Sequence, residues 1–149
     1  GSNEEARVVA LTGGLRPEVF PFDRGRKLRM FRELLGVIRR TRPDVVVVEG
    51  TGLAGGAALI LARLLFGTRY VVSSGDAVGP WVAGRFRALG PPFGLYERVL
   101  CRLAAGYIGW TPYLVGRALT FGVPRAMTAA GWAPFTRTPD ERAADRVRT

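Results

Sequence analysis

The acidic side chain best placed for chemistry is Asp76, which ends the segment Ser73-Ser74-Gly75-Asp76 after an apolar run. A carboxylate just past a strand of a parallel sheet faces the edge where such sheets bind ligands. Asp76 could there bind ligand hydroxyls or act as a base, and Gly75 would let another part of the backbone approach closely. The competing interpretation makes Asp76 the cap of the helix that follows.

A second group of small and hydroxyl residues follows an apolar run of four valines. Gly50, Thr51 and Gly52 open directly onto a helical pattern, so their backbone could approach an anionic or hydroxylated ligand at a helix N-terminus. Thr51 could equally be the cap of that helix. Trp110 and Thr111 hold the corresponding place between a later strand-like run and the helical pattern after it.

The composition rules out several other kinds of site. The chain has no His, which excludes His-centred zinc sites, Ser-His-Asp triads and imidazole acid–base chemistry within these 149 residues. A single cysteine, Cys101, excludes an internal disulfide. The Gly13-Gly14 pair lacks the spacing of the dinucleotide and P-loop phosphate motifs, so an ordinary turn is the simpler interpretation. We therefore expect neither a metal ion nor a cofactor.

The elements that must position these residues alternate along the chain. The expected strands are 7–12, 45–49, 69–74, 107–110 and 125–128, with 18–22 as a short edge strand because Pro21 forbids a central place. The expected helices are 27–40, 53–66, 80–89, 93–105 and 112–121, with a break at Gly90-Pro91-Pro92; a loop at 131–139 precedes the start of another helix at 140–148. This alternation predicts an α/β domain, a three-layer Rossmann-like fold with a mostly parallel sheet.

The charge of the chain bears on its partners. Its formal value is +10, from 22 Lys and Arg against 12 Asp and Glu. Between 81 and 103, aromatic and basic side chains share helical patterns, which suits either an anionic membrane interface or core-facing helices with solvated arginines. No recognition helix, RNA-recognition signature or zinc finger supports a nucleic-acid partner. The longest apolar stretches, 52–62 and 103–115, are too short to span a bilayer, so we expect a soluble or peripheral chain.

Five segments carry a family resemblance, and together they span roughly residues 40–135. They are Arg42-Pro-Asp-Val-Val-Val-Val-Glu-Gly50, Tyr70-Val-Val-Ser-Ser-Gly-Asp76, Ala105-Gly-Tyr-Ile-Gly-Trp-Thr-Pro-Tyr113, Gly122-Val-Pro-Arg125 and Gly131-Trp-Ala-Pro-Phe135. In order and spacing they resemble the N-terminal domain of GT-B glycosyltransferases of the retaining family four type. Asp76 matches the aspartate of the family's post-strand loop, whereas Gly75 stands where many members have histidine.

The resemblance implies one half of a GT-B architecture, the acceptor-binding domain of a retaining enzyme that moves a sugar from a nucleotide-sugar donor to a hydroxyl acceptor. It implies a catalytic role for Asp76. Thr111 matches the family's small hydroxyl residue near the interdomain cleft, and Gly131 matches the glycine of the loop that enters the second domain. Together with the loop residues identified above, the residues expected in substrate binding are Gly50, Thr51, Gly52, Gly75, Trp110, Thr111 and Gly131.

The family's E-x7-E pair, which marks the nucleotide-sugar site of a C-terminal domain, is missing because no two glutamates here are eight positions apart. We therefore expect residues 3–135 to form the domain, residues 136–149 to be a linker or the start of an absent second domain, and the chain alone to be inactive. The absent domain would hold most of the donor, the acceptor could be lipid-linked, and the location would be cytoplasmic or peripheral on the inner membrane face. The alternative is a non-catalytic basic module that binds an anionic membrane or a protein partner.

Overall fold

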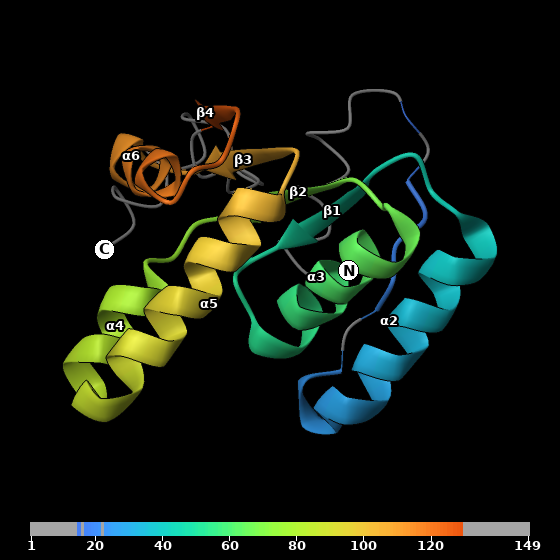
Figure 1. Cartoon of the computed structure of the whole chain (residues 1–149), viewed down its shortest axis with the longest axis horizontal. Coiled ribbons are helices and arrows are strands. Elements are labelled where there is room, and N and C mark those ends of the chain that lie inside the picture. The colour runs from blue at the N-terminus through green and yellow to red at the C-terminus, as the bar shows by residue number, and fades with distance from the viewer. Residues whose placement is uncertain (1–14, 16, 22, 130–149) are drawn as a thin grey trace, which may run out of the picture.

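The computed structural model describes residues 15, 17–21 and 23–129, and these form alternating helices and parallel strands (Figure 1). The strands are β1 (Val46–Glu49), β2 (Tyr70–Ser74), β3 (Gly106–Gly109) and β4 (Ala126–Thr128). The helices are α2 (Lys27–Thr41), α3 (Leu53–Phe66), α4 (Val78–Arg85), α5 (Gly90–Leu103) and α6 (Pro112–Thr120), with 3-10 turns η1 (Arg24–Arg26) and η2 (Arg87–Leu89). The four strands expected at 45–49, 69–74, 107–110 and 125–128 are therefore confirmed.

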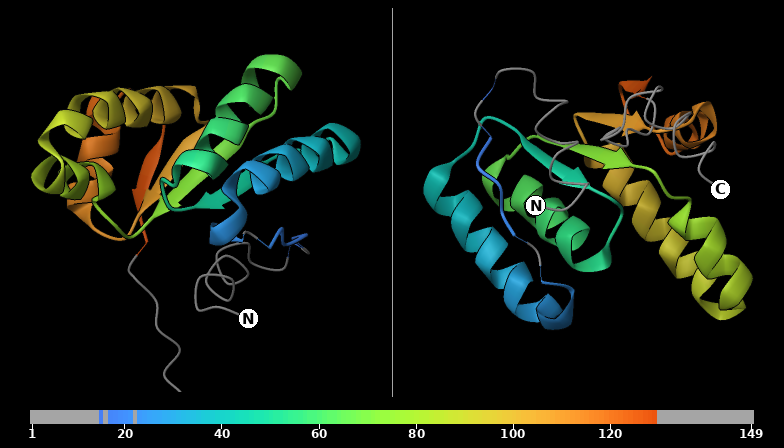
Figure 2. Two further views of the ribbon diagram at one scale, coloured as in Figure 1. Left: turned by 90° about the horizontal axis from the view of Figure 1, so that it is seen from below. Right: turned by 180° about the vertical axis from the view of Figure 1, so that it is seen from behind.

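The sheet is parallel throughout, and its strand order β1-β2-β3-β4 follows the chain. The crossovers between successive neighbouring strands place the connecting helices on one face of the sheet, as Figure 2 shows. Crossovers of one hand, the general rule for parallel strands, have this consequence when the strand order follows the chain. The α/β class and the Rossmann-like parallel sheet are thus confirmed. Within 23–129 the helices form a single layer, so the described residues supply two of the three expected layers, the sheet and one layer of helices.

The core lies between that helical layer and one face of the sheet. Val48, Val72 and Tyr107 face it from three neighbouring strands in register, and all belong to one cluster with the buried residues of α3, α5 and α6. The Tyr70 hydroxyl donates a hydrogen bond of 2.7 Å to the carbonyl of Leu100, which ties β2 to α5. This packing holds the carboxyl ends of the strands beside the first turns of the helices.

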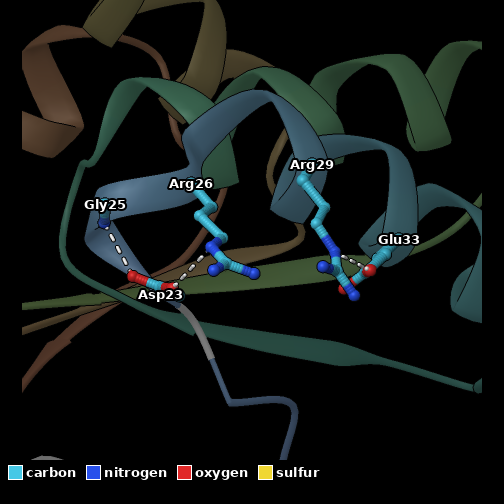
Figure 3. A network of polar contacts seen from close by, with 5 residues as sticks. All are labelled: Asp23, Gly25, Arg26, Arg29 and Glu33. Atoms are coloured by element: carbon cyan, nitrogen blue, oxygen red, sulfur yellow. Dashed lines mark hydrogen bonds and ion pairs between the residues drawn. The ribbon is translucent and has the colours of Figure 1, made fainter.

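Polar contacts order the turn η1, which leads into α2, and the exposed face of α2. The Asp23 carboxylate accepts a hydrogen bond of 2.7 Å from the Gly25 amide and lies 3.9 Å from Arg26 (Figure 3). Arg29 and Glu33 form an exposed ion pair of 2.6 Å along the helix. Such contacts give the polar face of α2 its order, while its apolar face packs on α3.

Two expectations need correction. Residues 18–21 lie in no strand, because 18 and 19 are exposed and pair with no neighbour among the described residues. Gly90-Pro91-Pro92 opens α5 and does not break it, since the first turn of a helix needs no amide donor and therefore accepts proline. The preceding helix is correspondingly short, with α4 ending at Arg85 before the separate turn η2.

Some expectations fall outside the described residues. These are the strand at 7–12, the Gly13-Gly14 turn, the loop at 131–139 and the helix at 140–148. Among the helices that the structure does describe, none combines the length and apolar character needed to cross a membrane.

Candidate functional site

The loops after β1, β2 and β3 meet at the carboxyl edge of the sheet. Gly50 donates its amide hydrogen to the Ser73 carbonyl at 2.6 Å, and Trp110 donates its amide hydrogen to the Ser74 carbonyl at 3.1 Å. These bonds continue the sheet beyond its last regular pairs, so the three loops have fixed relative positions. In open parallel sheets this is the edge at which ligands bind.

A small open depression, with enclosed room for about one water molecule, lies beside these loops on the helical side. Thr51 and Asp76, from the first and second loops, both line it. Glu97 of α5 and Arg117 of α6 line it as well. The structure therefore brings together two of the residues singled out from sequence and adds two that the sequence analysis did not name.

Thr51 has a buried hydroxyl with no hydrogen-bond partner. The residue is 4% exposed, and its Oγ1 finds no donor or acceptor among residues 23–129. The interpretation of Thr51 as a helix cap is wrong, because the cap of α3 is Gly52 and no side chain bonds the first turn of that helix. A buried polar atom of this kind is costly unless something satisfies it. Thr51 and the first amides of α3 can therefore offer hydrogen bonds to a ligand.

Asp76 stands exposed at the rim of the depression. It does not cap the following helix, because the cap of α4 is Ala77 and the first turn of α4 receives no side-chain hydrogen bond. The Ser74 hydroxyl instead donates to the Asp76 carbonyl at 3.2 Å and accepts from the Asp76 amide at 3.4 Å. This turn fixes the backbone at Asp76 and leaves its carboxylate free to face a ligand.

Gly75 makes room for the indole ring of Trp110. A Cβ atom built on Gly75 would lie 2.5 to 2.7 Å from three carbons of that ring, which is closer than real contacts allow. The expectation that Gly75 admits another stretch of backbone is therefore corrected, since a side chain fills the space. Trp110 lies against the loop that carries Asp76 and lines no part of the depression.

The remaining predicted site residues have mainly structural positions. Thr111 caps α6, because its hydroxyl accepts a hydrogen bond of 3.4 Å from the Leu114 amide. Gly50 adopts a positive φ of 83°, which glycine accommodates without strain. Gly52 is exposed and has open space around it. Gly131 lies outside the described residues.

An ion pair between Glu97 and Arg117, which was not predicted from the sequence, lies beside the depression. Glu97 is 5% exposed, and the Arg117 guanidinium lies over the Phe121 ring at 4.6 Å from its centroid. Gly79 permits this arrangement, because a Cβ atom there would overlap both charged groups. A signal was present in the sequence. Glu97 lies four residues before buried Cys101, on the apolar stripe of α5, where a lone carboxylate needs a partner.

Tyr96 secures the other loop of the site. Its hydroxyl donates to the Gly52 carbonyl at 2.9 Å and lies within 3.4 Å of the Thr51 carbonyl. The room for it comes from Gly56 of α3, where a Cβ atom would overlap the Tyr96 hydroxyl. Burial raises the pKa of Tyr96, so the phenol stays protonated and keeps donating at neutral pH.

Cys101 and Tyr107, which are also buried beside the depression, stay protonated as well. Burial raises the pKa of the Cys101 thiol to about 12, with the charge of Glu97 adding to the effect. Burial likewise raises the pKa of Tyr107 to about 12, against a smaller lowering by its side-chain interaction with Ser74. Neither group can act as a base near pH 7, which leaves the carboxylates for that role. Within the described part of the chain, no three His, Cys, Asp or Glu side chains gather as a metal site would require.

The sequence matches the model of a known protein family. The family described as glycosyl transferase 4-like domain matches residues 2–130, which is most of the chain. No curated protein matches the sequence.

Proposed function

The chain belongs to the glycosyltransferase 4-like domain family, and we propose that it supplies the acceptor side of a retaining GT-B transferase that moves a sugar from a nucleotide-sugar donor to a hydroxyl acceptor. Family membership establishes a glycosyltransferase domain and does not favour the alternative of a non-catalytic basic module. The acceptor role rests on the residues at the carboxyl edge of the sheet.

One observation carries the proposal. The unpartnered hydroxyl of Thr51 and the carboxylate of Asp76 line the same depression, from two different loops. A hydroxyl acceptor both donates and accepts hydrogen bonds, and a carboxylate is the stronger acceptor for its proton. Thr51 and the amides at the start of α3 would hold neighbouring oxygens of the same ligand.

The proposed chemistry gives each residue one task. Asp76 accepts the proton of the acceptor hydroxyl as its oxygen bonds to the anomeric carbon on the same face from which the nucleoside diphosphate departs. The diphosphate leaves with the electrons of the broken bond, and attack on that face retains the configuration. Gly50 and Gly52 have no side chains, so the ligand can approach the backbone of the first loop. Gly75 and Trp110 hold the Asp76 loop in place.

The remaining parts of the proposal concern the whole enzyme. Residues 3–135 would form the acceptor domain, and a second domain would bind most of the donor, so the chain alone would transfer sugar negligibly. Thr111 and Gly131 would lie toward that second domain. The acceptor could be lipid-linked, with the enzyme working on the cytoplasmic face of a membrane.

The test is a titration of the isotopically labelled chain followed by NMR. Methyl glycosides of glucose, galactose and mannose serve as acceptor probes, and UDP-glucose and GDP-mannose serve as donor probes. We expect at least one glycoside to move the amide signals of Thr51, Gly52 and Asp76 at millimolar concentration, with smaller shifts from the nucleotide sugars. If the nucleotide sugars move these amides and no glycoside does, the loops form a donor site and the proposal is wrong.

A further inference from the structure

We propose that the tip formed by α4, η2 and the start of α5 is a docking surface for an anionic lipid bilayer. The tip comprises residues 78–95, and its exposed apolar side chains are Trp81, Phe86, Leu89 and Leu95. The proposal goes beyond the sugar chemistry proposed above and does not depend on it.

The apolar side chains of the tip are too exposed to belong to the core. Trp81 is 65% exposed and Leu89 is 54% exposed, and neither joins the buried cluster. Trp81 and Phe86 touch edge to face, with ring centroids 6.4 Å apart, so the two rings form one surface. Figure 1 and Figure 2 show α4 and the start of α5 projecting together from the body of the ribbon.

The charge of the tip complements an anionic surface. Arg85 and Arg87 are both exposed and flank Phe86. No Asp or Glu occurs between Asp76 and Glu97, so no acidic side chain of that segment opposes them. Arginines beside aromatic side chains are the composition of interfacial anchors, in which indole and phenyl rings enter the headgroup region and guanidinium groups meet lipid phosphates.

The mixture of side chains favours lipid over nucleic acid. Leucine has no flat face on which a base could stack, whereas Leu89 and Leu95 would insert readily among acyl chains. The tip also starts two residues after Asp76, because α4 begins at Val78. Docking would therefore bring the candidate site close to the membrane plane.

Matched control residues lie outside the tip, on α2 and α3. Leu64, near the end of α3, is 65% exposed, the same as Trp81, and has Arg63 beside it. Arg39 and Arg40 form an adjacent basic pair in the last turn of α2. Variants of these residues change exposed apolar area or net charge to a similar extent without touching the tip.

The experiment is co-sedimentation of the 149-residue chain with vesicles of phosphatidylcholine and phosphatidylglycerol over a salt series. We expect Arg85→Gln with Arg87→Gln to weaken binding about 25-fold, at about fivefold per arginine, and Trp81→Ser to weaken it at least about tenfold. Leu64→Ser should leave binding unchanged. Arg39→Gln with Arg40→Gln should change it less than threefold.

A second readout reports insertion directly. Vesicles with brominated acyl chains should quench part of the tryptophan fluorescence, and Trp81→Phe should abolish most of that quenching while keeping most of the binding. Equal losses of vesicle binding in the tip variants and the control variants would show that only net charge drives binding, and this result would overturn the proposal. So would an absence of vesicle binding, or tip-dependent binding of single-stranded RNA without binding of vesicles.

Discussion

Replacing Glu97 by glutamine removes the negative charge of the ion pair with Arg117 and keeps the length of the side chain. The Glu97 side chain is 6% exposed and that of Arg117 is 25% exposed. After the substitution, the guanidinium would lie between a neutral amide and the Phe121 ring, with little water to solvate it. We expect a large loss of stability because a mostly buried charge has lost its counter-charge.

The magnitude follows from the burial of the two groups. Removing one partner of a fully buried ion pair costs about 3–5 kcal/mol. Arg117 keeps partial contact with water, and the new amide oxygen can still accept a hydrogen bond, so we expect a loss of about 2–3 kcal/mol. For a domain of this size, such a loss lowers Tm by roughly 4–12 °C.

Urea unfolding followed by circular dichroism measures this loss as a shift in midpoint at constant slope. The matched control is Glu33→Gln, which breaks the pair with Arg29 shown in Figure 3. Both side chains of that pair are well exposed, at 62% for Arg29 and 40% for Glu33, so water replaces the lost partner and the midpoint should not move measurably.

Two results would refute this reasoning. Equal midpoints for Glu97→Gln and Glu33→Gln would mean that burial adds nothing to the energy of the Glu97–Arg117 pair. If the difference in urea midpoint between Glu97→Gln and the parent vanishes in 1 M NaCl, salt screens the Glu97–Arg117 pair as it screens a surface pair.

Two further predictions follow from the packing of the same helices. Gly79→Ala places a methyl group against Glu97 and Arg117, and it should lower the free energy of unfolding in urea by about 1–3 kcal/mol. Gly84→Ala, on the same helix, meets open space and should raise that free energy by about 0.5–1 kcal/mol. Destabilisation by both variants would contradict the contact assigned to Gly79. With its pKa raised from 9.0 to about 12, Cys101 should hold roughly a thousandfold less thiolate at pH 8 than an unperturbed thiol, and should react with a disulfide reagent only on unfolding. The stability linked to this thiol is fully present below pH 9 and is lost as the pH rises through about 12, so the free energy of unfolding should fall over that range; reaction of the native chain at the rate of a free thiol would exclude such burial.

The elements could be predicted because their periodicity is local. The four-valine run and the Ala- and Leu-rich segment after it gave β1 and α3 almost to the residue, since continuous apolar runs and helical stripes need no distant partner to be recognised. The edge strand expected at 18–22 was wrong for residues 18–21, which pair with no strand among the residues that the structure describes.

The candidate site could be predicted only in part because its contacts join distant segments. Asp76 and Thr51 were identified because the topology puts both at one edge of the sheet. The closeness of Gly75 to Trp110 depends on how β2 and β3 align, and the approach of Glu97 to Arg117 depends on how α5 packs on α6. Neither contact can be predicted from the spacing of residues along the chain.

The limit of prediction from sequence is clearest for the helix caps. Thr51 and Thr111 both stand between a strand and a helix in the sequence, and either hydroxyl could cap. In the structure α3 begins one residue further from its threonine than α6 does, so Thr111 caps and Thr51 does not. A difference of one residue in a helix start, which propensity cannot resolve, decides which hydroxyl remains available for a ligand.

The acceptor role of Asp76 is the central claim, and the affinity of its asparagine variant tests it most directly. Asp44 provides the control because it is exposed and lies before β1, at the opposite edge of the sheet. In NMR titrations with whichever methyl glycoside binds the parent chain, we expect Asp76→Asn to weaken binding at least about tenfold, the loss of a hydrogen bond to a charged group. Asp44→Asn should bind as the parent does. Equal affinities for Asp76→Asn and the parent would contradict the account.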